Sequence, residues 1–110
     1  MAGYPAGLAA DRRTHTLYVG NAVTYRVAVV DGATRRVVTH VGPFGCCALN
    51  PTVLAVDQGT DTTYTANIDD NHLYATRGRG HHYRTSPALP IEPESIAVNP
   101  RSHTVYLTDS

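Results

Sequence analysis

Short apolar runs separated by polar turn residues fill the first forty residues of the chain. The segments Gly7–Ala10, Thr16–Val19, Tyr25–Val30 and Arg36–Val41 are rich in apolar and β-branched side chains, with Gly, Asp, Asn and Pro between them. No segment repeats its apolar positions with the sustained period of a helix. The pattern predicts a meander of four short antiparallel strands.

These strands carry apolar side chains on both faces. Successive residues of a strand point to opposite sides of the sheet, yet Val27–Val30 is apolar throughout, and so is Leu17–Val19. A sheet with one face in water alternates apolar and polar residues. We therefore expect each sheet to be covered on both faces.

One frame of residues occurs three times along the chain. Each copy opens with a proline, and a tyrosine follows 13 residues later, as in Pro5 and Tyr18, Pro51 and Tyr64, and Pro93 and Tyr106. The first two repeats are 46 and 42 residues long, counted from position 5 to 51 and from 51 to 93. Four-stranded sheets stacked between copies of themselves at this period are typical of a β-propeller.

The predicted fold class is therefore all-β, with consecutive four-stranded antiparallel β-propeller blades that form an incomplete propeller. The 110 residues are expected to make a single partial propeller. Blade one spans residues 5–50, blade two spans 51–92, and a half blade spans 93–110. A closed propeller ring contains more blades than these.

The repeat resembles that of the YVTN-type β-propeller family. Leu17–Asn21 is similar to the Y-V-T-N core of that repeat, and Pro5–Asp11 is similar to its opening P-x-G-I-A-V-D. Val29–Thr34 resembles the following I-D-x-x-T turn, and Val41-Gly42 resembles the closing V-G. The resemblance implies a bacterial, mostly extracytoplasmic propeller with a surface or scaffold role.

Blade two departs from the repeat in its outer half. Ala75, Thr76 and Arg77 stand where the first repeat has Val29, Val30 and Asp31, and Arg84 stands where it has Val38. The outer strands of blade two are therefore expected to be degenerate. Three arrangements would cover the remaining open surfaces: further blades of a longer gene product, a ring made with other copies, or a half blade that curls on itself.

Composition and charge restrict the partners. Hydrophobic residues make up 42% of the chain and charged residues 16%, which is too apolar for disorder. Nine Lys and Arg balance nine Asp and Glu, so the formal net charge is zero. Nucleic-acid binding calls for a basic surface, whereas a neutral surface favours self-association. We expect no nucleic acid, no membrane span, and a homo-oligomer through the open blade edges; residues 1–8 lack the pattern of a secretory signal.

The adjacent cysteines Cys46 and Cys47 are interpreted as small buried hydrophobes near a blade junction, because a bond between neighbours in an extended chain is strained. A reactive or intermolecular thiol is the alternative. With no disulfide framework, the two cysteines do not indicate a redox compartment.

Several groups of polar residues are predicted to be ordinary turns or loops. His15 and His103 occupy the same turn in two repeats, where the other repeat has Asp61, and polar residues are expected there. The spacing of the histidines matches no established metal-binding motif such as H-E-x-x-H. They are His15, His40, His72, His81, His82 and His103. Asp69-Asp70-Asn71 lacks the rest of a calcium loop, and Arg77–Gly80 is interpreted as a solvated loop.

No catalytic, cofactor-binding or metal residue is assigned from the sequence. There is no G-x-S-x-G and no phosphate-binding P-loop. The three repeat tyrosines are expected to pack between blades.

The leading hypothesis for the function is a binding scaffold, because propellers present loops on a rigid stack. The alternative is part of a propeller enzyme, lactonase-like or a metal- or quinone-dependent oxidoreductase, whose channel site needs further blades. A remnant without independent function is the third hypothesis.

Overall fold

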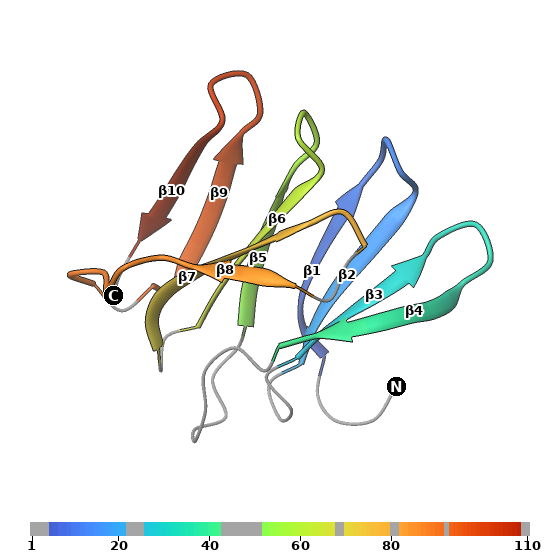
Figure 1. Cartoon of the computed structure of the whole chain (residues 1–110), viewed down its shortest axis with the longest axis horizontal. Coiled ribbons are helices and arrows are strands. Elements are labelled where there is room, and N and C mark those ends of the chain that lie inside the picture. Colours follow the sequence, from blue (N-terminus) through green and yellow to red (C-terminus); the bar gives the residue numbers. More distant parts are fainter. Residues whose placement is uncertain are drawn as a thin grey trace.

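The computed structural model describes residues 5–21, 26–42, 52–67, 70–79, 82–91 and 93–108. Within these ranges the chain forms ten strands in three antiparallel sheets and contains no helix. Figure 1 shows the sheets as a fan in which β1 (Pro5–Asp11), β5 (Thr52–Asp57) and β9 (Ser95–Asn99) lie side by side. The all-β, blade-repeat prediction is confirmed.

The first sheet is a four-stranded meander in the order β1-β2-β3-β4. Its other strands are β2 (Thr16–Asn21), β3 (Val27–Asp31) and β4 (Arg36–Val41). The predicted third strand agrees from Val27 onward, while residues 22–25 lie outside the described residues. The register shifts between Val29 and Val30, so β4 carries a bulge at Val38.

The second sheet has the order β5-β6-β7-β8, with β6 (Thr62–Asn67), β7 (Asp70–Arg77) and β8 (Tyr83–Thr85). Both outer strands form, although their apolar pattern is broken. Tyr74, Ala75 and Thr76 pair with Thr85, Arg84 and Tyr83 without a bulge. The degeneracy predicted for this half therefore affects the side chains and shortens β8 to three residues, but it leaves the meander in place.

The third sheet contains β9 and β10 (Thr104–Thr108). Its side chains alternate between exposed and half-buried along both strands. Ile96, Val98, Val105 and Leu107 lie on the half-buried face, and Tyr106 lies on the opposite face. Because β9 packs beside β5, the half-buried face is the one directed at blade two.

Repeated turn chemistry explains why the hairpins recur. Asp11 Oδ1 accepts the amide of Arg13 at 3.0 Å, and Asn99 Oδ1 accepts that of Arg101 at 3.0 Å, as Asp57 does from Gly59 at 2.9 Å. An Asp or Asn that binds the amide two residues later forms an Asx turn. The last turn residue is left-handed in each copy, with φ of 54° at His15, 52° at Asp61 and 56° at His103.

The apolar core lies between blades one and two. Tyr18, Val27, Val29 and Val41 pack from blade one against Leu54 and Tyr74 of blade two. Val27, Ala28 and Val29 are at most 2% exposed, so both faces of β3 are covered as the sequence predicted. Tyr18, at 2% exposed, packs between blades as expected, but Tyr106, at 56%, does not.

Candidate binding surface

The turn between β7 and β8 inserts an arginine into the face of blade one. Arg79 Nε donates to Thr16 Oγ1 at 2.9 Å, and Arg79 Nη2 donates to the Thr14 carbonyl at 3.1 Å. The same guanidinium lies 3.7 Å from Asp31 Oδ2. The sequence had indicated a solvated loop here, and for Arg79 this interpretation is wrong because blade one supplies three oxygen acceptors.

Two hydrogen bonds, one within blade two and one from blade one, hold the backbone beside Arg79. Gly78 adopts a left-handed φ of 63°, and its amide donates to the Asp61 carbonyl at 2.8 Å. Its own carbonyl accepts a hydrogen bond from the Tyr18 hydroxyl at 3.2 Å. These two bonds fix the turn so that the following side chain reaches blade one.

The equivalent place on blade two is an open cavity of about 460 Å³. It is lined by Thr62, Ala75, Arg77, His82, Tyr83 and Arg84. Thr62 pairs with Arg77 and Ala75 pairs with Arg84, so these four residues share one face of the sheet. Ala75 occupies the position of the fully buried Val29 in blade one, and its smaller side chain fills less of the space.

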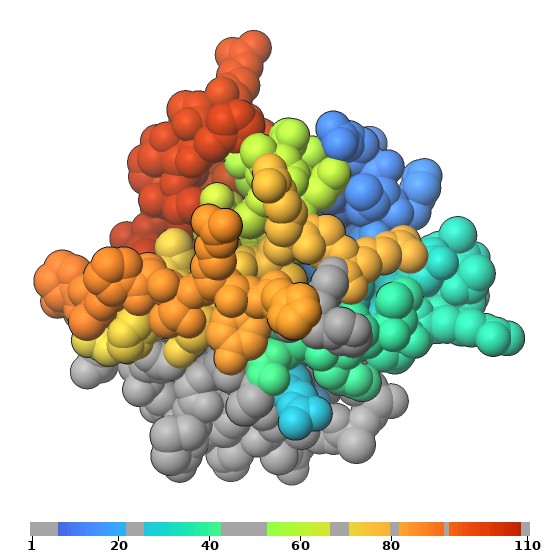
Figure 2. All heavy atoms as spheres, in the orientation of Figure 1, coloured from blue at the N-terminus to red at the C-terminus, as the bar shows by residue number. Residues whose placement is uncertain are grey.

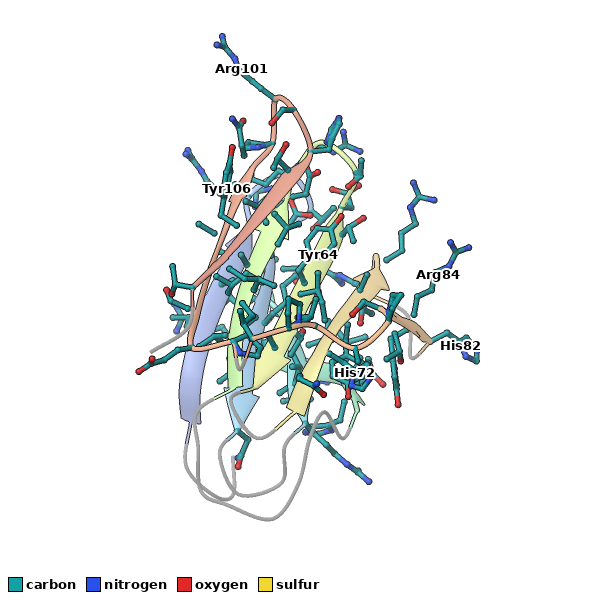
Figure 3. All side chains as sticks on the ribbon, turned by 90° about the vertical axis from the view of Figure 1, so that its left-hand side faces the viewer. Tyr64, His72, His82, Arg84, Arg101 and Tyr106 are labelled. Atoms are coloured by element: carbon teal, nitrogen blue, oxygen red, sulfur yellow. The ribbon has the colours of Figure 1, made fainter. Side chains whose placement is uncertain are left out.

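The cavity has the opposite charge from its counterpart. Thr16 and Asp31 pair in blade one, and Thr62 and Arg77 pair at the same positions in blade two. Arg77 and Arg84 are exposed, and neither side chain forms a hydrogen bond or ion pair with another described residue. Figure 3 shows His82 and Arg84 extending outward from the β8 side of the molecule. The cavity therefore offers cationic donors that no acid among the described residues occupies.

Two carboxylate contacts join the blades at the turns. His103 Nδ1 lies 2.7 Å from Asp57 Oδ2, across the junction of blade two and the half blade, which is the third blade of the series. At the junction of blades one and two, the equivalent positions hold Asp11 and Asp61. Asp11 Oδ2 and Asp61 Oδ1 are both buried, and neither receives a hydrogen bond from a donor among the described residues. The sequence predicts solvated turns at His15, Asp61 and His103, and the contact of His103 with the fully buried Asp57 shows that this last turn also joins two blades.

The two junctions shift carboxyl pKa values in opposite directions. Burial, followed by the neighbouring Asp61 carboxyl group, raises the pKa of Asp11, because two carboxyl groups close together resist carrying two negative charges. Burial also acts to raise the pKa of Asp57, but hydrogen bonds from His103 and the Gly59 amide outweigh it, so this pKa is lowered. Arg13 adds an ion pair of 2.9 Å to Asp61 Oδ2.

The remaining candidate residues do not form a further cluster. His40 is exposed, and the His72 ring lies 6.5 Å from the Tyr74 ring. Asn71 Nδ2 donates to the Leu89 carbonyl at 3.2 Å. Cys46, Cys47, Asp69 and His81 lie outside the described residues, as does the side chain of Asp70. In the described part of the chain no three His, Cys, Asp or Glu residues are placed to share a metal ion.

Comparison with known proteins shows the fold. No protein-family model matches the chain, and no curated protein sequence does. Kuenenia stuttgartiensis hydrazine synthase superposes with a TM-score of 0.81 at 19% identity, over 96% of this chain and 29% of that one. A nidogen/laminin complex matches with a TM-score of 0.79 at 16% identity, over 96% of this chain and 39% of that one. The chain is a run of β-propeller blades.

This propeller chain covers only a part of each structure it matches. The dihydro-heme d1 dehydrogenase NirN, in complex with DHE, matches with a TM-score of 0.75 at 13% identity, over 94% of this chain and 23% of that one. At these identities the likeness shows the fold, and the function has to be argued from the residues of the site. No helix among the described residues is long and apolar enough to cross a bilayer.

The Arg79 contact and the Asp57–His103 pair were missed because each joins residues from different blades. One sequence signal could have found the second contact. His103 occupies the same turn position as Asp61, and stacking one repeat on the next brings that turn beside the Asx residue of the preceding blade. For Arg79, the sequence gives no sign of which way the side chain turns from a glycine-flanked position.

Proposed function

We propose that this propeller chain is a binding scaffold, a fragment of or a subunit for a larger propeller of the YVTN type. In this proposal the blades are residues 5–50 and 51–92, with a half blade at 93–110, and the terminal blade faces dock against partner blades. Propellers carry binding loops on a rigid stack, which supports a docking role. The repeat motifs support a bacterial source.

The observation that carries the proposal is a pair of exposure differences at equivalent positions. Tyr18 is 2% exposed between blades one and two, whereas Tyr106 is 56% exposed on the outer face of the half blade. Leu54 is 8% exposed under blade one, whereas Leu8, at the same position of blade one, is 68% exposed. Each terminal face thus presents the residue that an internal junction buries.

The test is the association state of the chain. A dilution series followed by light scattering on a sizing column measures its molar mass. We expect concentration-dependent association, and we expect both Tyr106→Ser and Leu8→Ser to weaken it, because burying either side chain favours contact by about 1.5 to 3 kcal/mol.

A matched control distinguishes association through the blade faces from nonspecific hydrophobic association. Val38 is 48% exposed, but it lies at the bulge of the edge strand β4. Val38→Ser should leave the association unchanged. A chain that stays monomeric at every concentration, or one that responds equally to all three substitutions, would contradict docking through the terminal faces.

A further inference from the structure

We propose that the cavity on blade two binds an acidic side chain carried in the turn of a partner β-hairpin that pairs with β10. This inference deepens the proposed function and rests on it, since it names the kind of partner that the scaffold takes. It is argued from a contact that the chain already makes once, between Arg79 and blade one.

The contact on blade one is the template. The second strand of blade two, β6, pairs with β7, and the turn after β7 delivers Arg79 to Thr16 and Asp31 of blade one. The turn between the outer strands of one blade therefore fills a polar site on the blade before it. The filling residue is cationic, and the site that receives it contains a carboxylate.

Blade two repeats the receiving site with reversed charge. Thr62 stands in the place of Thr16, and Arg77 stands in the place of Asp31. The β7–β8 register ends at the pair of Thr76 and Tyr83, and the next residue on each side, Arg77 and His82, lines the cavity. Arg84 lies on the next row of the same face, opposite Ala75. An incoming arginine would meet like charges, whereas a carboxylate would gain charge-assisted hydrogen bonds from two guanidinium groups.

The free edge of β10 decides where the partner lies. The second strands of blades one and two each pair on both sides, β2 with β1 and β3, and β6 with β5 and β7. In the described residues β10 pairs only with β9. A hairpin added to this edge would take the place of a third and a fourth strand. The turn of this hairpin would then lie against blade two, just as the Gly78-Arg79 turn lies against blade one.

At the position of Arg79, neither the β3–β4 turn nor the β7–β8 turn of this chain carries an acid. The residue equivalent to Arg79 in the turn between β3 and β4 is Ala33. A second copy could therefore offer only alanine or arginine at that position, and neither complements Arg77 and Arg84. The partner hairpin is accordingly a segment other than these two, with Asp or Glu at the turn.

The experiment uses the whole 110-residue chain and three synthetic hairpins. Each peptide has the sequence of residues 27–41, with Glu, Gln or Arg at the position of Ala33. Titration is followed by calorimetry, and amide hydrogen exchange reports whether β10 becomes protected. We expect the Glu peptide to bind about tenfold more tightly than the isosteric Gln peptide, the effect of one charged hydrogen bond. The Arg peptide should bind most weakly.

A charge swap is the decisive variant. Arg77→Asp restores the Thr and Asp pair of blade one, so the preference should reverse and the Arg peptide should bind more tightly than the Glu peptide. Arg77 is exposed, so the far-ultraviolet circular dichroism of this variant should equal that of the original chain. Arg101→Gln, in the exposed turn between β9 and β10, is the control and should leave the order of the peptides unchanged.

Three outcomes would overturn the inference. Equal binding of the Glu and Gln peptides would show that the chain does not recognise the carboxylate. An unchanged order of the peptides in Arg77→Asp would show that the cavity is not the binding site. Binding of the Glu peptide without protection of β10, matched by glutarate alone, would assign the cavity to small dicarboxylates. If the chain still associates through Tyr106 and Leu8 while any of these holds, the inference fails and the proposed function stands. A monomeric chain that binds no peptide contradicts both.

Discussion

The junction of blades one and two and the junction of blades two and three share one backbone arrangement but differ in their side chains. At the first, Arg79 fills a site containing Asp31, and Asp11 meets Asp61. At the second, Asp57 pairs with His103, and the site containing Arg77 stays open. The space-filling view in Figure 2 shows the side of the molecule on which β7 and β8 lie in front. Equivalent positions at the two junctions thus carry side chains of different charge.

This difference separates what makes a blade from what selects its neighbour. Asx turns at Asp11, Asp57 and Asn99 and left-handed residues at the turn ends recur in all three repeats. These features need only an Asp or Asn side chain and the local backbone, so they form whichever residue faces that side chain across the junction. Residues that reach the adjacent blade can therefore differ from repeat to repeat, and they determine which neighbour fits.

The largest effect is expected at the repeat tyrosines. Tyr18→Ala should destabilise the chain by about 3 to 5 kcal/mol, because it opens a cavity in the junction core. Tyr106→Ala changes a residue that is 56% exposed, and it should shift the free energy of unfolding by less than about 0.5 kcal/mol. Urea unfolding of the two variants measures both values.

A conservative variant isolates the hydroxyl. Tyr18→Phe keeps the ring and removes the hydrogen bond to the Gly78 carbonyl, so it should cost about 1 kcal/mol. Equal losses for Tyr18→Ala and Tyr106→Ala would show that the half blade is packed as firmly as the internal junction, which would break the comparison.

A smaller effect is expected at the arginine that crosses the junction. Arg79→Met keeps much of the side-chain volume and removes the bonds to Thr16 and Thr14. Since the Arg79 side chain is 35% exposed, we expect a loss of about 1 to 2 kcal/mol in urea unfolding. Arg101→Met, in an exposed turn, is the matched control and should lie within about 0.5 kcal/mol of the original chain. A loss as large for Arg101 as for Arg79 would argue against the contact.

The sequence predicts the strands better than it predicts the junctions. Apolar runs on both faces at Val27–Val30 require cover on both sides, and Val27 and Val29 are buried as that argument demands. The outer strands of blade two are less predictable, because Ala75 and Arg77 break the apolar pattern. The backbone hydrogen bonds between β7 and β8 nevertheless hold the meander together. Whether Arg79 faces solvent or blade one depends on contacts distant in sequence, which no local pattern encodes.

The smallest effect expected is a difference in pH dependence between the two junctions. The pKa of Asp57 is lowered in the folded chain, so its contribution to stability is present above its ordinary pKa and is lost as the pH falls through the lowered value. The pKa of Asp11 is raised, so its contribution is present below the ordinary pKa and is lost as the pH rises through the raised value. The two groups respond to acid with opposite signs.

Asparagine substitutions separate these responses in urea unfolding measured from acidic to neutral pH. Asp57→Asn should be less stable than the original chain by about 1 kcal/mol at neutral pH, and the deficit should disappear as the pH falls into the acid range. Asp11→Asn should be least favourable in acid, where the raised pKa of Asp11 stabilises the original chain, and should equal or exceed the original at neutral pH. Two variants with parallel pH profiles would mean that the carboxyl groups at the two junctions are equivalent, and the contrast between the junctions would then be limited to Arg79 and Arg77.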